Sequence, residues 1–223
     1  MKKTVSMLLI ITLLLSMSAM LSGCGDEKKI LGTWTADVDY ADAFNLGIRS
    51  ADGMDEIAKY FEAEELIVTT TLIFRDDGSY TMTISEEAAV KAIESIEYIM
   101  YDGFEGIVKE QFKQLGLPIS LDKYLESMTH SIWDMVAAAL TEDVKDELID
   151  EMVNPHTGNY KIADGKIYMT EDVTDAISEE FYDTYELDGD TLTLLECFCQ
   201  IDEDQKEVQK ALYPMVFTRV VEE

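Results

Sequence analysis

Side chains suited to catalysis are few in this chain of 223 residues, which contains three cysteines and two histidines. Neither type is spaced to pair a nucleophile with a base. A glycine-rich phosphate loop, a serine nucleophile elbow and a His-Glu-x-x-His zinc motif are also missing from the sequence. Carboxylates are too numerous to single out a catalytic pair. The sequence therefore predicts a protein that is not an enzyme.

The histidines and the acidic runs have simpler interpretations than ligation of a metal. We expect His130 at the boundary between a helix and the sheet, and His156 in a loop after Pro155. Acidic side chains gather at residues 37–42 and 202–204, but neither run has the spacing of a calcium loop. We expect no metal site: these are solvated acidic loops, and a weak cation site is the alternative.

Cys24 follows a segment with the parts of a secretory signal peptide. Lys2 and Lys3 precede an apolar run over residues 7–15, and the stretch LSG stands directly before Cys24. A basic start, a short apolar core and small residues before a cut are typical of such peptides. A membrane-spanning helix would need about 20 apolar residues. We predict that residues 1–23 are removed, with an uncleaved signal anchor as the alternative.

The stretch LSGC at residues 21–24 resembles a bacterial lipobox. The resemblance implies that the Cys24 thiol carries a diacylglycerol and that Cys24, further acylated with a fatty acid such as palmitate, begins the mature protein. This covalent lipid is the only cofactor expected. Several acyl chains anchor a protein stably, and residues 24–29 would be a short lipidated tether. The expected location is the extracytoplasmic face of the cell membrane, which makes the membrane itself a partner.

The charge balance excludes one class of partner. The chain has 46 acidic and 17 basic residues, a formal net charge of −29 at pH 7. Loss of Lys2 and Lys3 with the leader would make the mature chain more acidic still. A surface of this sign repels phosphate backbones and anionic lipid headgroups, so we expect no nucleic acid partner and a domain held off the membrane surface to which it is tethered.

Cys197 and Cys199 alternate along a predicted strand and would point to the same face. A disulfide between them would close a very small, strained ring. We therefore expect two reduced, mostly buried thiols.

Hydrophobic periodicity divides the chain into two strand-rich parts and a helical middle. Alternation predicts strands at residues 30–38, 66–75 and 79–84, with short helices over 43–48 and 54–63 that cover one end. A period near 3.6 predicts three helices within residues 85–153, begun by Ser85, Ser120 and Thr141. We interpret residues 85–153 as a helical insertion between strands three and four.

The strand pattern returns in residues 154–223. Strands are predicted at 158–162, 166–170, 181–187, 191–198 and 215–221, with a helical turn at 203–211. The Asp-Gly pairs at 164–165 and 188–189 are typical of two-residue hairpin turns. About eight short strands in consecutive hairpins close naturally into a barrel, because a barrel has no exposed edge. The expected fold is mainly β (α+β): an antiparallel meander barrel built from residues 30–84 and 154–223.

Four stretches resemble lipocalins and their bacterial lipocalin-like relatives. Residues 31–34, LGTW, resemble the Gly-x-Trp first strand, and LIFRDDGSYTM, GNYKIADGKIYM and YELDGDTLTL resemble repeated hairpins in surface lipoproteins. The resemblance implies that Trp34 plugs the closed end of the barrel and that Arg219 packs over it, both in structural roles. A second or third lipocalin motif is not visible, and the insertion is not a lipocalin feature, so ligand transport does not follow.

Methionines suggest where a ligand would bind. Six of them would line a deformable apolar pocket between the insertion and the barrel, with ordinary core packing as the alternative: Met82, Met100, Met128, Met135, Met152 and Met169. The leading hypothesis is a non-catalytic binding protein for a small apolar ligand or an envelope partner protein, with the insertion as the recognition surface. The alternatives are an envelope enzyme with a site at the barrel mouth and a structural or regulatory envelope lipoprotein.

Overall fold

A computed structural model describes residues 27–51, 53–54, 56–116, 119–198 and 203–221. Its eight antiparallel strands pair in chain order and close into one barrel. The predicted mainly β architecture is therefore confirmed. The strands are β1 (Gly32–Asp39), β2 (Ile67–Phe74), β3 (Ser79–Ile84), β4 (His156–Ala163), β5 (Lys166–Met169), β6 (Tyr182–Asp188), β7 (Thr191–Phe198) and β8 (Met215–Arg219).

The barrel closes where its first and last strands pair. Trp34 of β1 lies opposite Arg219 of β8, while β1 pairs along its whole length with β2. The hairpin turns follow the predicted chemistry: Asp164 and Gly165 between β4 and β5 both have positive φ, 57° and 71°. A turn of this kind matches the twist of the strands on either side of it.

Within the described ranges, seven helical segments accompany the barrel. They are α2 (Glu27–Ile30), α3 (Ala41–Ser50), η1 (Ala58–Tyr60), α4 (Glu86–Leu115), α5 (Leu121–Ala139), α6 (Glu142–Val153) and α7 (Glu203–Leu212). The predicted N-caps are present, because the hydroxyls of Ser85, Ser120 and Thr141 accept backbone N–H groups at the starts of α4, α5 and α6. Gly116, with φ of 57°, ends α4. None of the helices in the described part of the chain is both long and apolar enough to cross a membrane.

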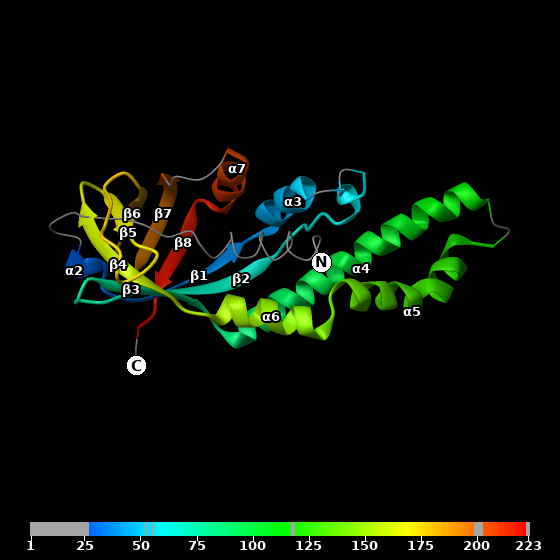
Figure 1. The fold of residues 1–223 in the computed structure, drawn as a ribbon, viewed down its shortest axis with the longest axis horizontal. Coiled ribbons are helices and arrows are strands. Elements are labelled where there is room, and N and C mark those ends of the chain that lie inside the picture. Colours follow the sequence, from blue (N-terminus) through cyan, green and yellow to red (C-terminus); the bar gives the residue numbers. More distant parts are fainter. Residues whose placement is uncertain (1–26, 52, 55, 117–118, 199–202, 222–223) are drawn as a thin grey trace.

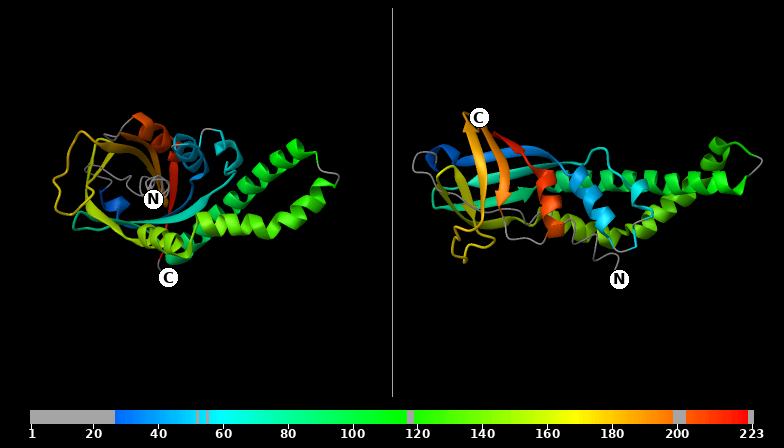
Figure 2. Two further views of the ribbon diagram at one scale, coloured as in Figure 1. Left: turned by 45° about the vertical axis from the view of Figure 1, so that its right-hand side comes forward. Right: turned by 90° about the horizontal axis from the view of Figure 1, so that it is seen from above.

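Helices α4, α5 and α6, which we call the helical arm, lie in the chain between β3 and β4. The arm projects from one end of the barrel, and α2 lies at the other end (Figure 1). Two further views show the same elongated shape (Figure 2). At 1.5 Å per residue, the 30 residues of α4 extend about 45 Å.

The segment around η1 braces α4 against the rest of the fold. The rings of Phe61 and Phe104 meet edge to face with centroids 5.3 Å apart. A Cβ atom at Gly103 would lie 2.2 Å from Cδ1 of Phe61, so a glycine is needed for this approach. The contact positions the arm relative to the barrel.

Large side chains fill the end of the barrel where Trp34 lies. The biggest fully buried ones on the strands are Trp34, Leu72, Phe74, Tyr80, Ile162, Ile167 and Phe217. The interior of a small barrel is just wide enough to be filled by side chains of this size. This closed end is therefore core.

Candidate functional site

The residues singled out at the closed end contact one another. Cys24 lies outside the described residues. The guanidinium of Arg219 lies 4.1 Å from the centre of the Trp34 ring, and Trp34 Nε1 donates a 2.7 Å hydrogen bond to the Ile30 carbonyl. Arg219 Nη1 also donates to the Leu31 carbonyl at 2.6 Å. The two side chains thus tie the segment before β1 to the end of β8.

The methionines lie in several different surroundings. Met100, Met152 and Met169 are buried in the main core, and Met82 packs against its edge. Met128 is half-buried on α5, and Met135 is 40% exposed there. Core packing accounts for the buried members.

The histidines differ from their predicted positions. His156 begins β4 and pairs with Met82 of β3, so the prediction of a loop is wrong: the ladder starts directly after Pro155. Its Nε2 atom is buried and makes no hydrogen bond, and burial lowers the pKa of the ring. His130 is not at a helix–barrel boundary, because its side chain is 92% exposed on the arm, 3.7 Å from Asp134.

A buried carboxyl group marks the opposite end of the barrel from Trp34, which we call the mouth. Asp183 is the second residue of β6 and is fully buried. Burial raises its pKa to about 8, even though the Tyr213 hydroxyl donates a 3.1 Å hydrogen bond to Oδ1. Oδ2 has no hydrogen-bond partner. Asp183 is therefore mainly protonated at neutral pH.

Further buried polar groups continue from this carboxyl through Tyr213 and Tyr40. Burial raises the pKa of Tyr213, and both Asp183 and the neighbouring Tyr40 add to the rise. Burial also raises the pKa of Tyr40, an effect that nearby Thr70 partly offsets. The Thr70 hydroxyl nevertheless lacks a partner in good geometry, as does Nε2 of Gln209, which is 4% exposed. Buried polar atoms without partners are uncommon, and several at one place mark a site for water or a ligand.

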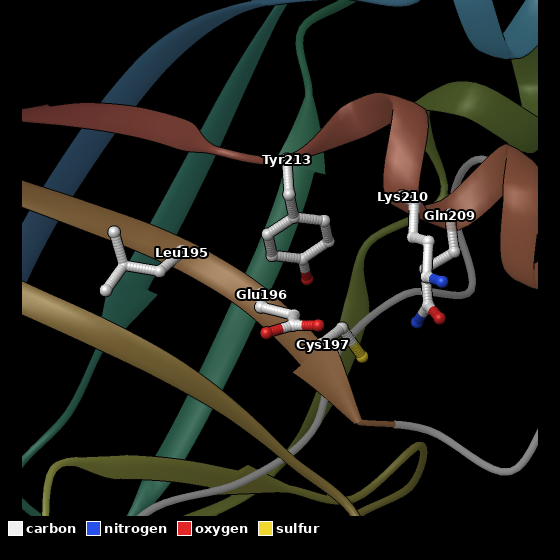
Figure 3. Close-up of a pocket in the computed structure, with 6 residues that line it drawn as sticks. All are labelled: Leu195, Glu196, Cys197, Gln209, Lys210 and Tyr213. Atoms are coloured by element: carbon white, nitrogen blue, oxygen red, sulfur yellow. The ribbon is translucent and has the colours of Figure 1, made fainter.

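A pocket of about 220 Å³ opens beside this cluster, between β7 and α7. In Figure 3 the Tyr213 hydroxyl points toward Glu196 and Cys197, and Gln209 projects from α7 over the same space. The pocket is thus lined by an amide donor, Gln209, together with the charged side chains of Glu196 and Lys210. The lining residues are Leu195, Glu196, Cys197, Gln209, Lys210 and Tyr213.

The prediction of a reduced Cys197 is wrong, because this residue is disulfide-bonded and only half-buried. Cys199 lies outside the described residues. The prediction rested on the strain of a ring closed by Cys197 and Cys199, and Cys197 is nevertheless oxidised. Cys197 therefore offers the pocket no thiol nucleophile.

Acidic side chains in the run at residues 37–42 accept hydrogen bonds that stabilise the fold. Asp39 accepts backbone N–H groups from Ala41 and Leu66, and Asp37 accepts the Thr69 hydroxyl. Among the described residues, no three His, Cys, Asp or Glu side chains are grouped to hold a metal ion. Asp202, in the second acidic run, lies outside the described residues.

Asp183 and Gln209 are the residues that sequence reasoning missed. The alternation of β6 gave a signal, because Asp183 and Tyr185 share the inward face. Comparisons with protein-family models, curated proteins and solved structures find no match to this chain.

Proposed function

We propose that the protein is a lipid-anchored, extracytoplasmic, lipocalin-like binding protein without catalytic activity, whose helical arm recognises an envelope protein. The observation that carries the proposal is an exposed aromatic cluster on the arm, formed by Tyr98, Tyr101 and Trp133. A binding role on the arm is also favoured by the packed closed end of the barrel, which leaves no room there for a large apolar ligand.

The aromatic cluster joins α4 to α5. The Trp133 ring lies 4.8 Å from the Tyr101 ring and 5.8 Å from the Tyr98 ring, measured between centroids. Tyr98 is 64% exposed and Trp133 is 36% exposed. Tryptophan and tyrosine carry much of the binding energy at protein interfaces, where they are buried by the partner. The cluster therefore offers an anchor point for another protein.

The charge of the arm specifies the chemistry of that partner. Exposed carboxylates adjoin the aromatic cluster at Glu94 and Asp134. Lys145 is held by ion pairs with Glu97 and Glu142. Further exposed acids lie along α6: Glu142, Asp143, Asp146, Glu147 and Asp150. Complementarity then requires a partner with basic residues around an apolar contact.

Three observations support the location and the lipocalin-like assignment. The leader ends in the lipobox-like LSGC. The disulfide at Cys197 would persist in an oxidising compartment outside the cytoplasm. A lipid thioether at Cys24 would leave Cys199 as the intramolecular partner for Cys197, since the chain has three cysteines. The closed barrel and the stacking of Arg219 on Trp34 suit a lipocalin-like domain.

Photocrosslinking in the native host tests the proposal. A photoreactive phenylalanine replaces Trp133, and the same residue at Ala138, exposed on another face of α5, serves as the control. We expect one discrete adduct from position 133, formed with an envelope protein that has a basic surface, and a weaker adduct when Tyr98→Ala is added. Identical adducts from both positions, or none from position 133, would contradict a specific docking surface.

A second candidate function is binding of a small polar ligand at the mouth. It rests on the unpartnered Gln209 Nε2 atom in the pocket and the unpartnered Asp183 Oδ2 atom beside it. Native mass spectrometry of residues 25–223 would detect a bound mass that disappears on denaturation. We expect Gln209→Leu to abolish that mass, and a bare protein mass for the unmodified chain would count against a tightly held ligand.

A further inference from the structure

We propose that Lys28, Lys29 and Arg219 form a phosphate-binding site for the headgroups of anionic lipids at the closed end of the barrel. The inference rests on the proposed anchor at Cys24 and adds a membrane-facing surface to it. It also assigns an orientation: the closed end toward the bilayer and the helical arm away from it.

The three cations line one hollow in the surface. The hollow, of about 580 Å³, is bounded by Lys28, Lys29, Leu187, Gly189 and Arg219. Lys28 and Lys29 are exposed on α2. Their side chains therefore reach solvent at the end of the barrel that carries the tether.

The third cation is held in place by the fold. Arg219 donates hydrogen bonds to the carbonyls of Leu31 and Lys29, and it stacks on Trp34. Its Nε atom lies 3.3 Å from Asp190, a carboxylate at the rim that is 72% exposed. The Arg219 side chain is 24% exposed and lines the hollow. A guanidinium ordered in this way loses little conformational freedom when an anion binds.

The length of the tether brings this hollow to the bilayer. Cys24 stands three residues before Glu27, where α2 begins. An extended chain spans at most about 3.6 Å per residue, so the tether reaches roughly 11 Å. An acylated Cys24 would thus keep α2 beside the lipid headgroups. Because α2 and the arm lie at opposite ends of the molecule, the arm would point outward (Figure 1).

Screening explains how a chain with a net charge of −29 can make this contact. At physiological ionic strength, charges separated by more than about 8 Å of solution are largely screened. The acids of the arm begin beyond the barrel and extend along α4 for about 45 Å. The bilayer therefore senses mainly the closed end, whose turns also carry the exposed carboxylates of Asp76, Asp77, Asp164, Asp188 and Asp190. There, each lysine close to an anionic surface contributes about a fivefold gain in affinity.

Tethered vesicles test the site separately from the anchor. Residues 25–223, which include every described element, carry an N-terminal hexahistidine tag and bind nickel-chelating lipid, so attachment does not depend on Cys24. We expect slower dissociation from vesicles containing about one-third phosphatidylglycerol than from pure phosphatidylcholine vesicles. Lys28→Gln with Lys29→Gln should remove most of that advantage, about fivefold for each lysine. High salt should remove it as well.

The matched control is Lys113→Gln with Lys123→Gln, two exposed lysines on the arm. Equal loss of the phosphatidylglycerol advantage in this control would overturn the site, because the effect would then be general charge. Unchanged dissociation of the Lys28/Lys29 variant would overturn it too. Millimolar glycerol phosphate, which has the chemistry of the headgroup, should reduce the advantage by competing for the hollow, and an unchanged advantage would overturn headgroup recognition there. Failure of Cys24 acylation in cells would refute the anchor without changing these vesicle measurements.

Discussion

Replacement of Asp183 by Asn should flatten the pH dependence of stability. Asp183 is fully buried, and burial raises its pKa from 3.8 to about 8. Between these values the native protein keeps the proton that the unfolded chain has released. The free energy of unfolding therefore falls as pH rises through this window and levels off above it. Asn has the shape of the protonated acid and cannot ionise, so the variant lacks this contribution.

The magnitude follows from the width of the window. One pKa unit corresponds to about 1.4 kcal/mol, so the Asp183 contribution falls by up to that amount per pH unit. Over roughly four units the sum is on the order of 6 kcal/mol. The second amide hydrogen of Asn adds an unpartnered donor, which costs about 1–3 kcal/mol at every pH. The variant should thus be less stable than the wild type at pH 4–5 and more stable at pH 8.

Urea unfolding at pH 5, 6, 7 and 8 gives the required slopes. Asp188→Asn is the control, because Asp188 is an exposed carboxylate on the same strand. Its unfolding free energy should run parallel to that of the wild type. A parallel line for Asp183→Asn as well would refute the reasoning, since it would mean that the buried carboxyl group is ionised in the native state.

Three more variants test other parts of the fold. Gly103→Ala should destabilise the protein by about 1–3 kcal/mol and raise hydrogen exchange around Phe61, because the new methyl group overlaps that ring; exchange raised evenly over the whole chain would contradict a local brace. Arg219→Gln should lower the unfolding free energy by about 2 kcal/mol through loss of the cation over Trp34 and the charged hydrogen bonds, and an unchanged denaturation midpoint would contradict that role. Cys24→Ala should move the protein from the membrane fraction to the soluble fraction, whereas continued sedimentation with membranes would contradict the lipid anchor.

Local chemistry was sufficient to predict most elements of the fold. Ser85, Ser120 and Thr141 begin their helices because a hydroxyl can accept the N–H groups that a helix start leaves unpaired. The Asp-Gly pair at 164–165 makes its turn because both residues tolerate positive φ. Consecutive hairpins then place each strand beside its chain neighbour, and the absence of exposed edges favours closure. These features depend on contacts within a few residues, which a sequence displays directly.

Only the tertiary structure distinguished the groups at the barrel mouth. Asp183 is one of 46 acidic residues, and its raised pKa comes from burial at the mouth, where Tyr213 contacts it from 30 positions away. Burial and desolvation are set by atoms distant in the chain, so no local pattern encodes them. The sequence by itself determined the helices and strands, their order and the proposed cellular location. Barrel closure decided which polar side chains are buried together at the mouth.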